Sequence, residues 1–348
     1  MRILISSYQF LPSIGGLETA TLTLADGLAE RGHDVTVVTA TPADGPDCFA
    51  FRVCRNPGAA ALVGLVREAD IVWQNHVSLR MLWPLLLVRR PLIIMHHIWL
   101  TEHAEAGPRF GTLKRLACKL GTNVFVSDIL RRSAQLPGRI IPNSYDEATF
   151  RLLPEVERDR DVAFLGRLVP FKGADTVIDA VALLAARHRR VNATMIGLGP
   201  EEGALRARTD AAGITDRVAF AGPVRGDALA RLLNRHRIMV VPSRWEEPFG
   251  IVVLEGLACG CVVAVADSGA LPEVVGPCGP VFPKNDAAAL AATLDDLLQN
   301  PERLNAYRGR TPAHLAKFTK RAFIDACEAT IHESVTASSR GALFSLRN

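Results

Sequence analysis

The chain has 348 residues, 49% of them hydrophobic and 22% charged, which excludes a disordered chain and gives enough length for two domains. Its formal net charge of +4 is too small for a dedicated nucleic-acid binder. Its seven cysteines are an odd number without a Cys-x-x-Cys pair, so we expect a reduced, cytoplasmic protein and not a disulfide framework.

Short apolar runs alternate with longer amphipathic segments, which is the pattern of a parallel, doubly wound α/β sheet. The first half contains six strand candidates: Ile3–Ser6, Val35–Thr39, Ala69–Trp73, Leu92–His96, Thr122–Val126 and Arg139–Pro142. Because the chain begins directly on a strand, we expect no signal peptide. No uncharged run approaches the ~18 residues of a transmembrane helix.

A Gly-Gly turn follows the first strand. Ile14-Gly15-Gly16-Leu17-Glu18 opens a segment, Glu18–Arg31, with helical character. Glycines at this point allow the backbone to approach a diphosphate closely, although a tight turn without a ligand is an equal alternative. The turn lacks the G-x-G-x-x-G spacing of a dinucleotide binder, which disfavours a nicotinamide oxidoreductase.

The fourth strand candidate ends in two histidines, His96 and His97. Parallel sheets place reactive groups at the carboxyl ends of their strands, so His96 is a candidate contact to a substrate hydroxyl or a general base. The alternative is a structural pair that bonds to loop backbone. We expect no zinc site, because no nearby cysteine or carboxylate has ligand spacing.

A basic segment spans residues 80–132, which carry nine lysines and arginines against three acidic residues. Within it, Met81–Val88 and Phe110–Leu120 combine apolar and basic side chains and are predicted to be amphipathic helices. Such helices can lie on the anionic inner face of a membrane, which would make the protein peripheral there. They can equally be ordinary helices with solvated charges.

The strand pattern restarts after a charged segment, residues 147–160, which we interpret as a linker. Five further strand candidates follow: Asp161–Leu165, Ala193–Ile196, Val218–Ala221, Ile238–Val241 and Val262–Ala266. We therefore predict two Rossmann-like domains, residues 1–150 and 151–320, that face a central cleft in which ligands bind. Residues 321–348 form a C-terminal helix that can cross back to the first domain.

Two cations follow the first strand of the second half. Gly166-Arg167 ends that strand, and Lys172-Gly173 comes five residues later. Arg167 can bind a phosphate bidentately and Lys172 can supply a point charge, unless both only cap a surface helix. Further along, the backbone near Val224 could contact the edge of a base.

Two carboxylates flank a predicted helix start, Ser243-Arg244-Trp245-Glu246-Glu247-Pro248-Phe249-Gly250. Pro248 suits a first helical turn, which would place Glu247 at the mouth of the turn and Glu255 about two turns along the helix. The N–H groups of residues 249–251 would then form an anion site. Asp159-Arg160-Asp161, a metal-binding pattern in some sugar transferases, lies at the start of a strand and is interpreted as chance.

In their order along the chain, these motifs resemble the retaining glycosyltransferases of family 4, which have the GT-B fold. The resemblance rests on the Gly-Gly-x-Glu turn, on Pro142-Asn143-Ser144, on Gly166-Arg167 with Lys172-Gly173, on Glu247 with Glu255, and on Gly269-Ala270-Leu271-Pro272-Glu273. Three departures concern turn shape: Ser144, Ala270 and Gly256 stand where glycine, glycine and alanine are usual. None removes a charged group.

The resemblance implies a role for each matching residue. Arg167 and Lys172 would neutralise the diphosphate of the donor, Glu255 would hold the ribose hydroxyls, and Glu247 and His96 would meet the donor sugar. The remaining matches concern backbone that would lie against the donor: Gly16 at the phosphates, Gly250 and Ile251 at the distal phosphate, and Val224 at the base. Gly166 would be a further donor-binding residue.

The resemblance also implies the reaction. The enzyme would transfer a sugar with retention from a nucleotide-diphosphate sugar to an acceptor hydroxyl, in cell-surface glycan or glycolipid assembly, with no metal and no cofactor. Small-molecule acceptors stay open. The alternatives are a nucleotide-sugar epimerase of the same fold and a catalytically silent nucleotide-sugar-binding subunit. No contact with nucleic acid is expected.

Overall fold

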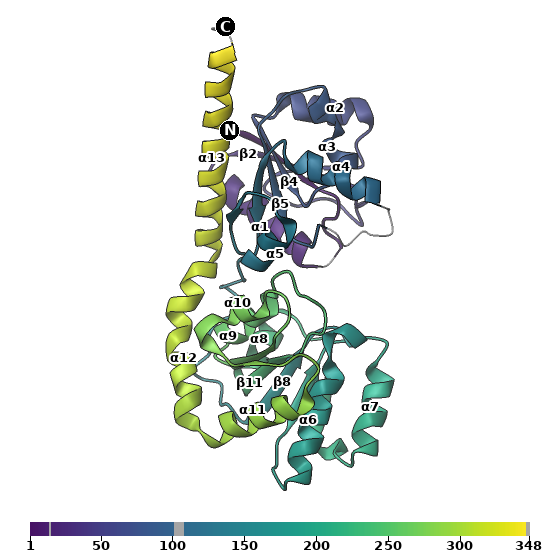
Figure 1. Ribbon diagram of the computed structural model, residues 1–348, viewed down its shortest axis with the longest axis vertical. Coiled ribbons are helices and arrows are strands. Elements are labelled where there is room, and N and C mark those ends of the chain that lie inside the picture. Colours follow the sequence, from purple (N-terminus) through teal and green to yellow (C-terminus); the bar gives the residue numbers. More distant parts are fainter. Residues whose placement is uncertain (14, 101–107, 346–348) are drawn as a thin grey trace. The chain divides into compact units, whose positions relative to one another are not determined.

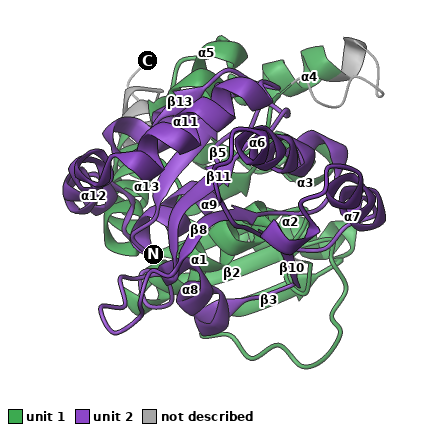
Figure 2. Ribbon diagram, turned by 90° about the horizontal axis from the view of Figure 1, so that it is seen from below, with its two compact units in different colours: residues 1–144, 320–348 green, residues 145–319 purple. Residues whose placement is uncertain are grey.

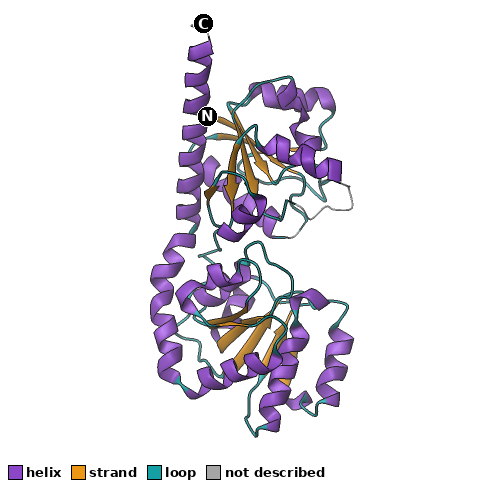
Figure 3. Ribbon diagram, in the orientation of Figure 1, coloured by secondary structure: helices purple, strands orange, loops and turns teal. Residues whose placement is uncertain are grey.

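The computed structural model describes residues 1–13, 15–100 and 108–345. The chain divides into two compact units (Figure 2): unit 1 comprises Met1–Ser144 and Lys320–Asn348, and unit 2 comprises Tyr145–Thr319. Each unit contains one parallel sheet with helices on both of its faces (Figure 3). The α/β class with two parallel sheets, expected from the alternating pattern, is confirmed.

The sheet of unit 1 has seven strands in the order β3-β2-β1-β4-β5-β6-β7. Their bounds are β1 Arg2–Ser7, β2 Asp34–Thr39, β3 Arg52–Arg55, β4 Ile71–Asn75, β5 Leu92–His96, β6 Thr122–Phe125 and β7 Arg139–Ile140. The central strands are buried on both faces, which explains their nearly continuous apolar sequences. The sequence did not predict β3, because this short edge strand is half-exposed and has an arginine at each end.

Six α-helices belong to unit 1 within the described part of the chain: α1 Gly16–Glu30, α2 Ala59–Glu68, α3 Leu79–Leu82, α4 Pro108–Cys118, α5 Asp128–Ala134 and α13 Lys320–Ser345. The single helix expected over Met81–Val88 is wrong. The helix α3 ends at Leu82 and a 3₁₀ helix, Trp83–Leu86, follows. Pro84 has no N–H to continue the α-helical pattern, and its carbonyl accepts from both Leu87 and Val88 at 2.9 Å.

The long C-terminal helix α13 packs along α1 in unit 1 (Figure 1). Polar side chains fix its position: Arg31 pairs with Asp325 and Glu328, and His33 Nε2 lies 2.8 Å from Glu328 Oε1. The closest approach is at Gly27, where a Cβ would lie 2.5 Å from both Cδ1 and Cγ1 of the buried Ile324. The two helices can approach this closely because Gly27 has no side chain.

We predict that Gly27→Ala destabilises the protein by about 1–3 kcal/mol, because the new methyl group overpacks against Ile324. Gly64 is the matched control: it lies inside α2, and a Cβ there meets nothing within 4 Å. Gly64→Ala should therefore stabilise by about 0.5–1 kcal/mol through helix propensity. Chemical denaturation measures both; equal effects would contradict the packing.

The sheet of unit 2 has six strands in the order β10-β9-β8-β11-β12-β13. Their bounds are β8 Arg160–Leu165, β9 Ala193–Ile196, β10 Val218–Gly222, β11 His236–Val241, β12 Val262–Ala266 and β13 Val281–Phe282. The five strand segments predicted in this half agree with β8 to β12 within two residues at each end. Only the two-residue β13 was not predicted.

Seven α-helices cover this sheet in the described residues: α6 Ala174–Ala186, α7 Glu202–Ala211, α8 Gly226–Asn234, α9 Ile251–Ala258, α10 Leu271–Val275, α11 Ala287–Gln299 and α12 Pro301–Leu315. The helices α6 and α11 pack against each other and bury the apolar side chains that face β8 to β12. Across both units, none of the helices that the structure describes is both long and apolar enough to span a bilayer.

Candidate active site

The loops at the carboxyl edge of the unit 2 sheet hold most of the residues singled out in the sequence. Since all strands of this sheet are parallel, the segments that follow β8, β9, β10 and β11 meet at one edge. The contact is close: Gly197 has φ +141°, and a Cβ there would lie 1.9 Å from Gly166 O. Gly197 N also donates to Gly222 O at 2.8 Å. The backbone of Gly166, the residue before Arg167, is therefore packed tightly against Gly197.

Lys172 lies in a short 3₁₀ turn, Pro170–Lys172, that precedes α6. The next residue, Gly173, has φ +71°, and a Cβ there would lie 2.2 Å from Pro242 O. A larger residue would be strained and would also clash, so glycine lets the turn lie against the end of β11. This contact brings Lys172 to the loop that contains Glu247.

Lys172 and Glu247 form an ion pair, with Nζ 2.5 Å from Oε1. Ser243 Oγ donates to the same carboxylate oxygen at 2.7 Å. The loop is fixed to the Lys172 turn by Phe171 O, which accepts from Arg244 N at 2.8 Å and from Trp245 N at 3.2 Å. The structure therefore brings together two residues that are 75 positions apart in the sequence.

Arg167 is exposed and makes no ion pair within the described residues. Its Cζ lies 5.6 Å from the centroid of the Phe171 ring, and the Phe171 and Trp245 rings are 6.2 Å apart. Both rings are more than one-third exposed. The guanidinium is thus held over an aromatic face with its donors open to solvent, as a phosphate contact requires.

Glu246, the neighbour of Glu247, has a structural role that the sequence analysis missed. Its carboxylate accepts from Gly269 N at 2.5 Å and pairs with Lys284, and the hydrogen bond from Lys284 is the main reason that the pKa of Glu246 is lowered. Gly269 has φ +56°, and a Cβ there would lie 2.3 Å from Glu247 O. The segment that begins at Gly269 therefore packs directly against the backbone of Glu247.

The helix α9 begins at Ile251 with Gly250 as its N-cap, so the prediction that Pro248 occupies the first helical turn is wrong. Gly250 has φ +98°, a left-handed conformation that ends the loop and delays the helix by three residues. Within the described part of the chain, the N–H groups of Gly250 and Ile251 donate no hydrogen bond. They are free donors at a helix N-terminus, as the predicted anion site requires.

Glu255 lies just over one turn into α9, not two, because the helix starts later than expected. Burial, with a smaller contribution from Asp146, raises the pKa of its carboxyl to about 7. The carboxylate makes no hydrogen bond or ion pair with any described residue. A half-buried carboxyl group without a partner among the described residues indicates a site that a ligand completes.

Two predicted residues belong to unit 1. Gly16 is exposed and is the first residue of α1, as the turn predicted. His96 ends β5, is 1% exposed, and stacks on Phe125 with ring centroids 4.6 Å apart. Its Nε2 lies 3.0 Å from Asn123 Oδ1, while Asn123 Nδ2 donates to Cys118 O.

This network leaves His96 Nδ1 as a buried atom without a partner within the described residues. Burial lowers the pKa of His96 to about 4 and that of His97 to about 3, so both rings are neutral near pH 7. His96 is thus held as a hydrogen-bonding group, with Nδ1 as its acceptor. His76, which the sequence analysis missed, meets the His96 ring edge-on at 6.3 Å.

The amino-acid sequence of the chain is similar to those of known glycosyltransferases. The family model described as "Glycosyl transferases group 1" matches residues 146–313, nearly the whole of unit 2. A phosphatidyl-myo-inositol mannosyltransferase of Mycobacterium leprae is 27% identical over 86% of this chain and 88% of its own. The corresponding protein of Mycolicibacterium smegmatis is 28% identical over 91% and 90%. Residues 146–313 belong to the glycosyl transferases group 1 family.

Solved structures agree on the fold. The Anabaena protein HepE, in its complex with UDP, matches with a TM-score of 0.80 at 20% identity and covers 96% of this chain and 100% of its own. Sucrose-phosphate synthase of Thermosynechococcus elongatus matches with a TM-score of 0.77 at 20% identity, over 97% of this chain and 99% of its own. The GT-B fold is thereby confirmed, and the protein is a glycosyltransferase of a retaining family.

Two departures of this group 1 glycosyltransferase from the family pattern have local explanations. At Gly256, a Cβ would lie 2.5 Å from Met239 Cε, so the methionine fills the space that the usual alanine would occupy. Ala270 is fully buried and has φ −83°, a conformation open to any residue, so alanine replaces glycine there without backbone strain. Neither departure replaces one of the two site carboxylates, Glu247 and Glu255.

The Asp159-Arg160-Asp161 pattern of this glycosyltransferase lies at the amino end of β8. Asp159 accepts from Arg235 Nε at 2.9 Å, and Asp161 Oδ2 accepts from Asn192 N at 3.1 Å. Each carboxylate therefore has its own structural partner. In the described ranges, no group of three or more histidine, cysteine or acidic side chains is placed to hold a metal ion.

Proposed function

We propose that this glycosyltransferase transfers a sugar, with retention at the anomeric carbon, from a nucleotide-diphosphate sugar to an acceptor hydroxyl in glycolipid or cell-surface glycan assembly. One observation carries the proposal: Lys172, paired with Glu247, shares the carboxyl edge of one sheet with Arg167 and with the N–H groups of Gly250 and Ile251, none of which is paired among the described residues. We assign donor binding to unit 2 and acceptor binding to unit 1.

In this proposal the diphosphate of the sugar nucleotide accepts hydrogen bonds from groups of unit 2 that are unpaired among the described residues. Arg167 binds one phosphate bidentately, and the N–H groups at the start of α9 bind the distal one. Lys172 then shares its charge between the phosphate and Glu247, which lies against the sugar. Glu255 accepts from the ribose hydroxyls, and backbone near Val224 contacts the base.

The transfer needs charge stabilisation more than a protein nucleophile. The bond between the anomeric carbon and the phosphate oxygen breaks, and negative charge builds on the distal phosphate. Fixed cations and N–H groups stabilise that charge without reorganising, so we propose that no metal ion is required. The acceptor oxygen bonds to the same face of the sugar, and its proton passes to the departing phosphate. Gly16 and neutral His96 of unit 1 would contact the phosphates and the sugar.

Relatives support the choice of acceptor class. The name of the mycobacterial relatives describes mannosyl transfer to phosphatidyl-myo-inositol, which is a phospholipid. HepE, which this chain resembles in fold, has been solved with UDP-glucose. A lipid-linked or cell-surface acceptor and a uridine diphosphate sugar are accordingly the first substrates to test.

A thermal-shift panel of nucleoside diphosphates and their sugar derivatives tests the donor half of the proposal. We expect one base to raise the unfolding temperature and its sugar nucleotide to raise it further. Incubation of that donor with and without a phosphoinositide acceptor then separates transfer from epimerisation, because an epimerase converts the donor alone. Failure of every nucleotide to bind would contradict the proposed function and would favour a silent subunit.

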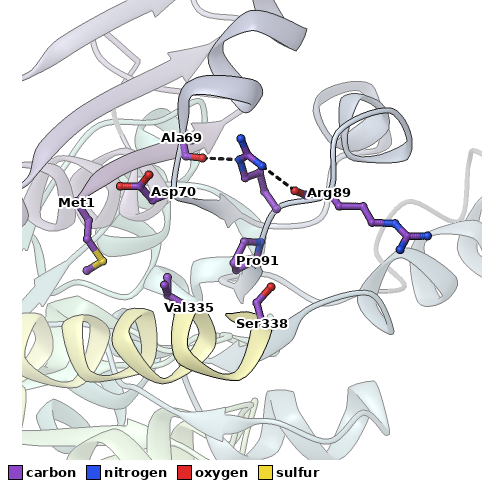
Figure 4. Close-up of a pocket in the computed structure, with 8 residues that line it drawn as sticks. Met1, Ala69, Asp70, Arg89, Pro91, Val335 and Ser338 are labelled. Atoms are coloured by element: carbon purple, nitrogen blue, oxygen red, sulfur yellow. Dashed lines mark hydrogen bonds between the residues drawn. The ribbon is translucent and has the colours of Figure 1, made fainter. Parts of the chain in front are cut away.

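We also propose that unit 1 contacts the inner face of the membrane through residues 80–132. Leu86 and Leu87 are 79% and 69% exposed, and Leu113, Leu116 and Leu120 around α4 are each more than half exposed. A pocket of about 440 Å³ in unit 1 is lined by Asp70, Arg89 and Val335, and the side chain of Arg89 extends away from the other two (Figure 4). Arg90 Nε donates to Ala69 O at 2.6 Å. Lys114 is buried, so it does not contribute to this surface.

Replacing both Leu86 and Leu87 by glutamate should abolish sedimentation with vesicles that contain anionic lipids, because it removes apolar insertion and adds repulsion. Leu183→Glu changes an exposed leucine of unit 2 and should sediment like the unchanged protein. Equal sedimentation of all three proteins would contradict the membrane contact.

A further inference from the structure

A pocket of unit 2 lies at the opposite end of α9 from the proposed donor site. Its volume is about 600 Å³, which is in the range of small-molecule sites. The amino end of α9 carries Gly250, whereas Leu257 and Ala258 at its carboxyl end line this pocket. Eight helical residues separate the two ends, which corresponds to about 12 Å.

Two half-buried guanidinium groups line the pocket without a carboxylate partner within the described residues. Arg158 donates to His236 O at 2.7 Å and to Cys259 O at 2.6 Å. Arg308, on α12, donates from Nε to Gly260 O at 3.0 Å, from Nη2 to Arg237 O at 3.3 Å and from Nη1 to Asn305 Oδ1 at 3.5 Å. Each guanidinium has five N–H donors, so each retains donors that these carbonyls do not use. Both guanidiniums lie against Gly260: Arg308 Nε donates to its carbonyl, and a Cβ on Gly260 would lie 2.2 Å from Arg158 Nη2. Burial and the neighbouring Arg158 charge lower the pKa of Arg308.

The rest of the lining combines an apolar wall with few other charges. Phe150, Leu257 and Leu315 provide apolar side chains, and each is less than one-tenth exposed. Beyond the two cations, Arg151 and Glu147 are the charged side chains of the lining, so positive charge is in excess. Two close cations beside apolar side chains favour a ligand with an anionic head and a short apolar body.

The pocket also touches both segments through which the chain passes between its two units. Tyr145 is the first residue of unit 2 and Thr319 is the last, and both line the pocket. Tyr145 N donates to Phe318 O at 3.2 Å, which ties the two segments to each other. A ligand here would contact both of the connections that a change in domain arrangement must bend.

We propose that this pocket binds a small organic anion, a carboxylate or phosphate monoester with a short apolar chain, between Arg158 and Arg308. The bound anion supplies the missing counter-charge for the two guanidiniums and covers the apolar wall. Because the occupant lies against both connecting segments, binding also alters the turnover of the transferase. This second statement rests on the proposed function, whereas the binding statement does not.

Calorimetric titration of the full chain with hexyl phosphate tests the binding. We expect saturable binding that is at least about tenfold weaker in Arg308→Gln, because that change removes one charged donor group. Arg310→Gln is the matched control, since Arg310 lies on the same helix but does not line the pocket. Ala316→Trp, at an exposed pocket position, should block binding while both arginines remain.

Further ligands define what the site recognises. Inorganic phosphate should bind more weakly than hexyl phosphate, and hexyltrimethylammonium should not bind. Titration with lysophosphatidic acid distinguishes a lipid ligand from a soluble one: binding tighter than that of hexyl phosphate indicates a lipid, and weaker binding indicates a soluble anion. Equal binding of hexyl phosphate by all the variants, or binding weaker than about 10 mM, would overturn the proposal. Normal binding of hexyl phosphate with unchanged transferase turnover would overturn only the statement that binding alters turnover. The same titration with a sugar nucleotide reports separately on the donor site.

Discussion

Replacing Lys172 by alanine should lower transferase turnover by about 10²–10³-fold, the usual cost of removing one fixed group that stabilises transition-state charge. The lysine is held in place by Glu247 at 2.5 Å and by the 3₁₀ turn before α6, so its charge is positioned before the donor arrives. Arg167→Ala should cost turnover of the same order, because the exposed guanidinium has no ion-pair partner in the described residues and can bind phosphate directly.

Initial rates with the donor found in the thermal-shift panel measure both effects. The matched control is Lys284→Ala, which removes the lysine of the neighbouring Glu246 pair on the surface. The fold should survive the loss of Lys172, because Ser243 still donates to Glu247. Unfolding temperatures near that of the unchanged protein establish this. Near-normal turnover of both Lys172→Ala and Arg167→Ala would refute the assigned donor site.

Replacing Glu255 by glutamine should stabilise the protein above pH 7 and weaken donor binding at the same time. Burial raises the pKa of this carboxyl from 4.5 to about 7, so the folded state prefers the protonated form. The stability that this preference provides is complete below pH 4.5, falls as the pH rises through the unfolded value, and is fully lost above about pH 7. Glutamine cannot ionise, so the variant escapes that loss.

The expected difference in unfolding free energy is near zero at pH 4.5 and on the order of 2 kcal/mol in favour of the variant at pH 8. Donor binding should show the opposite order. An ionised carboxylate accepts hydroxyl hydrogen bonds more strongly, so donor affinity of the unchanged protein should rise as the pH passes 7. The affinity of the glutamine variant should be lower and independent of pH in this range.

Denaturation and donor titration across pH 4.5–8 give both profiles. Glu68→Gln replaces an exposed glutamate of unit 1 and serves as the control, with no pH-dependent gain in stability expected. A Glu255 variant that gains stability but binds the donor normally would show that the carboxyl is merely a buried group. A variant without any gain would show that the carboxyl is not desolvated.

The sequence determined the fold class and the elements of unit 2 because both follow from local composition. Buried parallel strands such as β9 and β12 are continuous apolar runs, and both were predicted at their observed bounds. Short edge strands such as β3 and β13 have no such run and were missed. Gly15-Gly16 likewise indicated the start of α1, because glycine before an amphipathic run is a local signal.

The tertiary structure decided where the chemistry-bearing side chains point and what they contact. Pro248 suggested a helix start, but the positive φ of Gly250 moves it to Ile251 and shortens the distance along the helix to Glu255. The sequence identified Lys172 and Glu247 as separate candidates, and only the contact of Gly173 with Pro242 makes them a pair. Charges and turns are local in sequence, whereas ion pairs, burial and pKa values depend on what long-range packing brings beside them.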